Sequence, residues 1–261
     1  MSSLTRTGRA LFLAAVFGFG LMHCFYAMTI KAPVPGPPWV PGGRIWAGVM
    51  AVFLIAAGVA IMTRARARLA AGLLALVLFL LVLFHYVPLL AANSRNPGPW
   101  TSGFELLAMC GTALILAAAT PVEAAEYPPR PAMGNPLIHA GRFLLAALLV
   151  VVGVQHLIYA HFVATLVPGW IPGHLFWAYF VGVAFFAAAL AIASGVQRRL
   201  AGMLLGAMFF LWVLIVHLPR IIGAVHNGNE WTSGLLALAM SGGALIVAGG
   251  DSEYATSHCS R

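Results

Sequence analysis

Long apolar segments alternate with short polar ones along nearly the whole chain. Runs of about 20 residues, which suffice for a helix to cross a hydrocarbon core of ~30 Å, occur in eight places. They are residues 10–30, 45–62, 70–92, 103–120, 142–163, 175–194, 200–222 and 232–249. This pattern predicts an all-α integral membrane protein with eight transmembrane helices.

The chain also repeats itself. At an offset of 133 residues, and of 131 beyond the additional Pro37 and Pro38, the first part of the sequence aligns with the second. The aligned residues include Gly8-Arg9 with Gly141-Arg142, His23 with His156, Pro88 with Pro219, and Trp100-Thr101-Ser102-Gly103 with Trp231-Thr232-Ser233-Gly234. Such agreement predicts two homologous four-helix units, residues 1–120 and 141–250, with a linker at 121–140 and a polar tail at 251–261. Because its counterpart is internal, we expect the first apolar run to be a helix and not a cleaved signal peptide.

Composition excludes a soluble domain. Hydrophobic residues make up 62% of the chain and charged residues only 8%, and the mean hydropathy is +0.95. The net charge of +8 is dispersed over short loops, so it indicates membrane topology and not a nucleic-acid interface. The three cysteines include no CxxC pair, which argues against a disulfide framework or a thiol-redox motif.

Loop charges predict the orientation of the chain. One side holds most of the arginines: Arg6, Arg9, Arg64, Arg66, Arg68, Arg130, Arg142, Arg198, Arg199 and Arg261. The other side holds only Lys31, Arg44, Arg95 and Arg220. The positive-inside rule therefore predicts that both termini are cytoplasmic and that the two units are parallel repeats, related by an axis along the membrane normal.

Histidines gather on the predicted outer side. They are His23, His85, His156, His161, His174, His217 and His226. Four of them, His23, His85, His156 and His217, are expected ~10 Å deep in their spans. Polar groups at such depth are candidates for a functional site, although Tyr26 and Tyr159, each three residues after a histidine, equally suit histidines that join helices. In the repeat His217 aligns with Tyr86 and not with His85, so the two units direct this imidazole about 100° apart.

Three uses of these histidines remain open. His23, His85, His156 and His217 are candidate axial ligands of a b-type haem, whereas the absence of CxxCH excludes a c-type haem. A copper or other transition-metal site would draw on Met22, Met28 or Cys24. Imidazoles also hydrogen-bond the carbonyl groups of a quinone and relay its protons.

The segment from Trp100 to Glu105 contains a polar cluster. Ser102 and Glu105 have the spacing of a capping box at the start of the fourth span. In both units Thr and Ser lie at a helix N-terminus that is predicted to face outward, where free amide groups and the helix dipole favour an anion or a ligand carbonyl. Asn96 and Asn227 lie just upstream of these residues. Arg220, His226 and Glu230 make the second unit the more polar of the two.

These observations define a candidate ligand site in the second unit. It comprises His156, Tyr159, His161, His217, Arg220, Asn227, Trp231 and Thr232, with first-unit counterparts His23, Tyr26, His85, Asn96 and Trp100. The alternative interpretation of the paired tryptophans is that they are anchors at the membrane interface. These are Trp39, Trp46 and Trp100 and their counterparts Trp170, Trp177 and Trp231.

The order of these motifs resembles the DoxX-like family of bacterial membrane proteins. The resemblance rests on the Gly-Arg start, the His followed by Tyr, the Val-Pro-Gly-Trp turn, His217-Leu218-Pro219, and the Asn and Trp-Thr before a span with Gly-Gly-Ala-Leu at 242–245. It implies a four-helix unit in the bacterial inner membrane and quinone-linked redox work with a periplasmic electron donor or a partner subunit. The alternatives are a non-catalytic accessory or assembly subunit that binds lipid or a partner protein, and a bis-histidine haem carrier.

Overall fold

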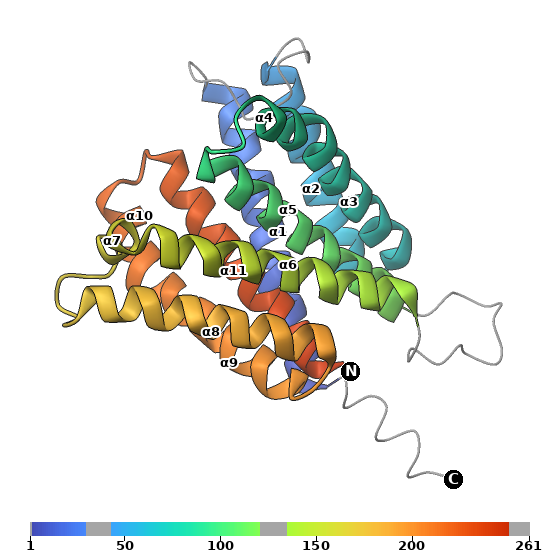
Figure 1. Cartoon of the computed structure of the whole chain (residues 1–261). Helices are drawn as coiled ribbons and strands as arrows, with labels where there is room; N and C mark the ends of the chain where they lie inside the picture. The colour runs from blue at the N-terminus through green and yellow to red at the C-terminus, as the bar shows by residue number, and fades with distance from the viewer. Residues whose placement is uncertain (1, 30–42, 121–134, 251–261) are drawn as a thin grey trace, which may run out of the picture. The chain divides into compact units, whose positions relative to one another are not determined.

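The computed structural model describes residues 2–29, 43–120 and 135–250, and every regular element in these ranges is helical. The linker residues 121–134, the tail 251–261, Lys31, Trp39 and the side chain of Tyr26 lie outside the described residues. The first half contains α1 (Ser3–Thr29), α2 (Gly43–Thr63), α3 (Ala67–Leu81), the π-helical turn η1 (Val82–Tyr86), α4 (Val87–Ala92) and α5 (Pro97–Ala119) (Figure 1). The second half contains α6 (Pro136–Ile158), α7 (Ala160–Ala164), α8 (His174–Ser194), α9 (Arg198–Trp212), the π-helical turn η2 (Val213–His217), α10 (Leu218–Gly223) and α11 (Gly228–Gly249).

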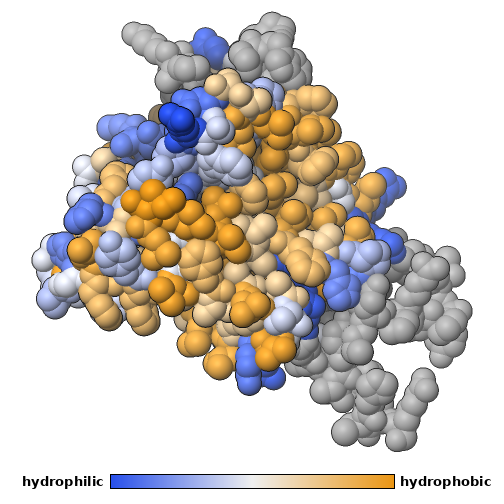
Figure 2. All heavy atoms as spheres, viewed as in Figure 1, coloured by the Kyte–Doolittle hydropathy of each residue, from blue (hydrophilic) through white to orange (hydrophobic). Residues whose placement is uncertain are grey.

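The predicted eight spans are confirmed, and the chain is an all-α integral membrane protein. Eight helices of the described chain are long and apolar enough to cross a membrane. Their outer surfaces carry large apolar side chains, as surfaces facing lipid tails require. Examples on α3 and α8 are Leu69, Leu73, Phe79, Phe176, Phe180 and Val183. Figure 2 shows apolar side chains over much of the face in view.

Several helix ends differ from the prediction: the first and fifth spans begin at Ser3 and Pro136, six or seven residues early, and two further differences bear on the candidate site. The fourth span begins at Pro97 instead of residue 103, because an asparagine caps it six residues earlier. The fifth span was predicted as one helix to residue 163, which is wrong. It ends at Ile158, and Tyr159 has φ −108° and ψ 31°, which interrupts the helix before the short α7.

The third span of each half has a π-helical turn at the same place. The turns η1 and η2 lie 131 residues apart, and a proline, Pro88 or Pro219, follows each by two residues. Proline cannot donate a backbone hydrogen bond, and its ring excludes the carbonyl four residues earlier. The wider turn keeps other bonds intact, since the Val87 and Leu218 amides reach the carbonyls of Val82 and Val213, five residues back. π-Helical turns of this kind frequently mark functional sites.

Contacts divide the chain into two compact units, Met1–Phe12 with Arg142–Arg261, and Leu13–Gly141. This division falls inside α1 and α6, whereas the sequence repeat divides the chain at the linker. Glycines at corresponding positions of the repeat make close helix contacts within each of these two units. In one, Gly242 of α11 lies against the backbone of Gly8 and Phe12. In the other, Gly141 of α6 lies against the carbonyl of Gly111.

The arginine of the second Gly-Arg pair closes the end of a neighbouring helix. Buried Arg142 donates from Nε and Nη2 to the carbonyl oxygen of Ile192, at 3.2 and 2.6 Å. Ile192 lies in the last turn of α8, where carbonyl groups lack helical partners and the helix dipole favours a cation. Gly195, with φ 82°, ends that helix beside the guanidinium group.

Arg142→Met is expected to lower the free energy of unfolding by about 1–3 kcal/mol, because it leaves a buried carbonyl without its charged donor. Unfolding in mixed detergent micelles measures this loss. Arg68→Met, at an exposed arginine of α3, is the matched control. An equal loss in both variants would contradict a capping role for Arg142.

Candidate functional site

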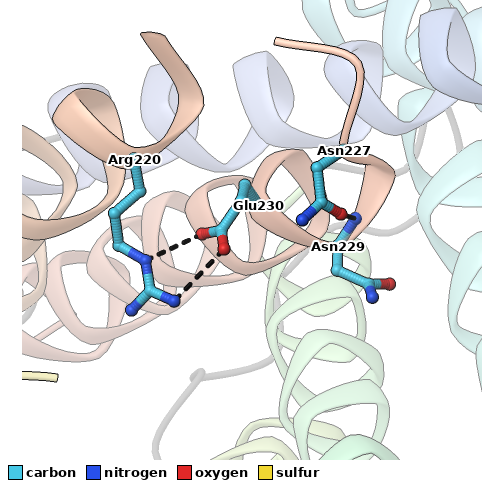
Figure 3. A network of polar contacts seen from close by, with 4 residues as sticks. All are labelled: Arg220, Asn227, Asn229 and Glu230. Atoms are coloured by element: carbon cyan, nitrogen blue, oxygen red, sulfur yellow. Dashed lines mark hydrogen bonds and ion pairs between the residues drawn. The ribbon is translucent and has the colours of Figure 1, made fainter. Parts of the chain in front are cut away.

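The asparagine at the start of the last helix in each half is an N-cap. Asn96 Oδ1 accepts a hydrogen bond from the amide of Gly98 at 3.1 Å. Asn227 Oδ1 likewise accepts from the amide of Asn229 at 3.0 Å (Figure 3). The side-chain carbonyl of each asparagine is therefore engaged with a backbone amide that would otherwise lack a partner.

The capping box predicted for Ser102 and Glu105 is wrong. Because α5 begins at Pro97 with Asn96 as its N-cap, both residues lie inside the helix and not at its end. The cap is the asparagine, one turn and a half further upstream. Glu105 thus has no capping function, and its position within a membrane span needs another explanation.

The tryptophan and threonine that follow each cap bond to their own backbone. The indoles bond to the loop before the helix: Trp100 Nε1 donates to Ser94 O at 2.8 Å, and Trp231 Nε1 donates to Val225 O at 2.9 Å. The threonines bond to the first turn of the helix: Thr101 Oγ1 donates to Pro97 O at 3.1 Å, and Thr232 Oγ1 donates to Gly228 O at 2.9 Å. Each donor in the first half has its counterpart 131 residues later in the second half, and the same holds for each acceptor. The indole has a single N–H donor, so this bond engages it fully. The shared motif therefore fixes the turn before each last helix.

Asn227→Ala is expected to lower the free energy of unfolding by about 1 kcal/mol, the usual cost of losing an N-cap. Asn227→Asp retains an oxygen acceptor and should keep most of that stability. Detergent unfolding of both variants measures the difference. Equal stability of the alanine variant and the unmodified protein would exclude a capping role.

His23 and His156 hold the same position in the repeat and make the same hydrogen bond. Their Nδ1 atoms donate to the carbonyls of Phe19 at 2.8 Å and Val152 at 2.7 Å, four residues earlier on the same helix. A carbonyl only accepts, so Nδ1 carries the hydrogen, and a neutral ring then presents Nε2 as an acceptor or metal ligand. The spacing of three residues predicts that Tyr159 shares a helical face with His156, and this is wrong, because α6 ends at Ile158, between them.

The ring of His156 belongs to an aromatic cluster within the second half. It meets Phe185 of α8 edge to face, with centroids 5.1 Å apart. Phe185 in turn contacts Phe209 and Trp212 of α9, at 5.9 and 6.0 Å. The helix backbones approach closely here, because Gly182 leaves room for the Cβ of His156, 3.0 Å from where its own Cβ would lie.

His217 and Tyr86 occupy the same place in their respective halves, as the alignment predicts. Each is the last residue of its π-helical turn. Each also lies over the glycine of the Trp-Thr-Ser-Gly motif. A Cβ on Gly103 would be 3.2 Å from that of Tyr86, and a Cβ on Gly234 would be 3.4 Å from that of His217. These two glycines admit a large side chain from the neighbouring turn.

Two imidazoles in the π-helical turns have a buried nitrogen without a partner. The Nδ1 atoms of His85 and His217 are buried, and among the described residues neither has a hydrogen-bond partner. Leaving a buried polar atom unpaired costs about 1–3 kcal/mol. Such an atom in a native structure calls for an explanation, and a bound ligand, a water molecule or a catalytic role each supplies one.

A charged pair lies beside His217. Arg220 Nε is 3.0 Å from Glu230 Oε2, and Arg220 Nη2 donates to Glu230 Oε1 at 3.1 Å (Figure 3). The side chains are 42% and 16% exposed, and both groups act electrostatically on His217. The first half has Leu89 and Pro99 at these positions. Within the described residues, therefore, the second half alone combines an imidazole with an ion pair at this level.

The remaining predicted residues do not join this group. His161 is exposed on α7, and Tyr159 is exposed in the break before it. His156 contacts α8 whereas His217 contacts α11, so these two histidines belong to different helix pairs. Among the described residues no three His, Cys, Asp or Glu side chains form a metal-binding group.

Sequence reasoning did not include Glu230 in the site. The signal was present, because Arg220 and Glu230 have opposite charge and both lack a counterpart in the first half. What the sequence could not supply was the fold of the turn between them, which brings the two side chains together.

The fold and these residues define a multi-pass, all-α membrane protein with two related halves and a polar group around His217. A family model described as a domain of unknown function (DUF8561) matches residues 145–241. No curated protein and no solved structure matches the chain. The matched segment includes His156, His217, Arg220 and Glu230. Its description states no activity, so it assigns no ligand to these residues.

Proposed function

We propose that this protein binds an isoprenoid quinone, or a similar lipid-soluble carbonyl compound, at His217 in the second half. We further propose that it is a quinone-linked redox component of the bacterial inner membrane, as the resemblance to the DoxX-like family implies. The observation that carries the proposal is the buried Nδ1 of His217, which has no hydrogen-bond partner among the described residues.

The chemistry of the group fits a quinone carbonyl. A neutral imidazole offers one donor and one acceptor nitrogen, so it can donate to a quinone and accept from the corresponding quinol. A ligand carbonyl at Nδ1 would offset the cost of that buried atom. A quinone, when bound, supplies the electron-accepting chemistry. His217 would orient its carbonyl, and the Arg220–Glu230 pair would set the local charge.

The site is proposed to face the periplasmic leaflet. The arginine distribution supports this, because it favours cytoplasmic termini and so an outward position for the turns after the third and seventh spans. A periplasmic electron donor or a partner subunit would then reach the site from that side. Membrane lipid surrounds the rest of the chain.

A non-catalytic accessory or assembly subunit is the second candidate. The observation that favours it is that the motif shared by both halves serves the fold, since Asn96, Trp100 and their counterparts bond to the backbone. A bis-histidine b-type haem is a third candidate. Its support is that His23 and His156, each within its own half, donate from Nδ1 to a helix carbonyl, which orients Nε2 as in haem-ligating histidines.

A reduced-minus-oxidised absorption spectrum of the protein, extracted with its native lipid, tests these candidates together. A bound quinone is expected to give an ultraviolet change on reduction, with quinone enriched over the surrounding membrane. A Soret band would show bound haem, which would contradict this proposal and favour the haem carrier. A featureless spectrum without quinone enrichment would replace it with the accessory role.

A further inference from the structure

Glu105 is a carboxyl group inside a membrane span, and no cationic side chain among the described residues pairs with it. Two carboxyl side chains, Glu105 and Glu230, lie in the described ranges 2–29, 43–120 and 135–250. Glu230 is paired with Arg220. Glu105 is half-buried on α5, ~12 Å along the helix from Pro97. An ionisable residue at such depth is costly unless it has a function or a partner.

The side chain of Tyr86 lies over α5 beside this carboxyl group. Gly103 admits it, with the Tyr86 Cβ 3.2 Å from where a glycine Cβ would lie. Its hydroxyl group hydrogen-bonds the Ser102 side chain, and the Glu105 carboxyl acts electrostatically on the phenol. Ser102 and Glu105 share a helical face, since they are three residues apart. The hydroxyl groups of Tyr86 and Ser102 thus lie next to the acid.

Few other titratable groups face this cluster. The turn η1 contributes His85, whose ring meets Tyr86 edge to face at 4.9 Å and whose buried Nδ1 has no partner among the described residues. Of the other elements in contact with α5, α4 carries no titratable residue and α3 carries only Arg68, at its opposite end. The start of α6, with exposed His139, contacts α5 near Gly111, two turns further on.

The cluster is specific to the first half. At the corresponding positions the second half has His217 for Tyr86 and Leu236 for Glu105. The fold of this region therefore does not require an acid, because the same helix accepts leucine in the other half. A residue that the architecture does not need, placed at a cost in an apolar span, indicates a function.

We propose that Glu105 is a proton-binding site within the membrane, at which a neutral carboxyl group exchanges its proton through Tyr86 and Ser102. An unpaired carboxylate in an apolar setting takes up a proton, because burying the charged form costs more free energy than burying the neutral acid. A metal cation fits this site poorly, since hard cations take several oxygen ligands and the described residues supply a single carboxylate here. The proposal does not depend on quinone binding.

Infrared spectra of the full chain in lipid test it directly. The spectrum of the unmodified protein minus that of Glu105→Gln, at pH 7, is expected to show the C=O stretch of one protonated carboxyl group. Glu105→Leu, which places the residue of the second half at this position, should give the same band. Glu230→Gln is the matched control and should reveal ionised carboxylate bands, because Glu230 is paired with arginine.

Transfer to D2O distinguishes an exchanging proton from a locked one. A downshift of the Glu105 band within minutes supports the proposal, and Tyr86→Phe should slow that shift at least tenfold, whereas Tyr179→Phe, at an exposed tyrosine of α8, should not. Carboxylate bands from Glu105 at pH 7 would overturn the proposal. A protonated band that does not shift in D2O would also overturn it, because the acid would then be structural.

Discussion

Gly242→Ala is expected to cause a large loss of stability, because the added methyl group would meet the backbone of a neighbouring helix. A Cβ at this position would lie 2.5 Å from the backbone nitrogen of Phe12 and 2.6 Å from the carbonyl oxygen of Gly8. Both contacts are with backbone, which no side-chain rotation can relieve. The start of α1 would have to move away from α11, and overpacking of this kind costs about 3 kcal/mol or more.

Gly72→Ala is the matched control, since it adds the same methyl group to a helix interior with nothing within 4 Å. It should be neutral or stabilising by up to about 1 kcal/mol, because alanine favours helix more than glycine does. Unfolding of both variants in mixed detergent micelles measures the contrast. Similar stability of the two variants would show that α1 and α11 do not approach as closely as the structure has them.

His217→Leu is expected to weaken binding of a short-chain benzoquinone, decylubiquinone, by at least tenfold. The variant removes the imidazole donor but keeps an apolar side chain of similar size. Leaving the buried quinone carbonyl without its donor costs about 1–3 kcal/mol, and each 1.4 kcal/mol is a factor of about ten in Kd. Quenching of tryptophan fluorescence on titration with decylubiquinone measures the Kd.

His226→Leu provides the control for this prediction. His226 is exposed in the loop before α11. The control makes the same histidine-to-leucine substitution nearby and should leave the Kd for decylubiquinone unchanged. Equal affinities of the two variants and the unmodified protein would remove His217 from the site. A loss in both would indicate a general effect of the region.

The repeat and the apolar runs were enough to predict the eight spans. In lipid the backbone N–H and C=O groups of a span must hydrogen-bond within that span, so each span is a long apolar helix that is visible in the composition of the sequence alone. The alignment of His217 with Tyr86 also predicted correctly that they hold the same place. The π-helical turns were not predicted, although Pro88 and Pro219 mark them, since a proline kink and a π-helical turn have the same sequence signal.

The candidate site was harder to predict, because side-chain partners depend on packing. Asn227, Trp231 and Thr232 are polar residues at a helix start that is predicted to face outward, which is typical of a ligand site, yet their polar groups bond to their own backbone. Glu105 was assigned to a cap because the helix start was placed six residues too late. Both errors arose from local geometry that residue types alone do not specify.

Photolabelling with an azidoquinone tests the central proposal most directly. The protein in native lipid is illuminated with the reagent, digested, and the labelled peptides are located by mass spectrometry. The proposal predicts labelling concentrated on the segment from η2 to the start of α11, displaced by excess decylubiquinone and lost in His217→Leu. Labelling spread evenly over the lipid-facing helices, and unaffected by decylubiquinone, would contradict it.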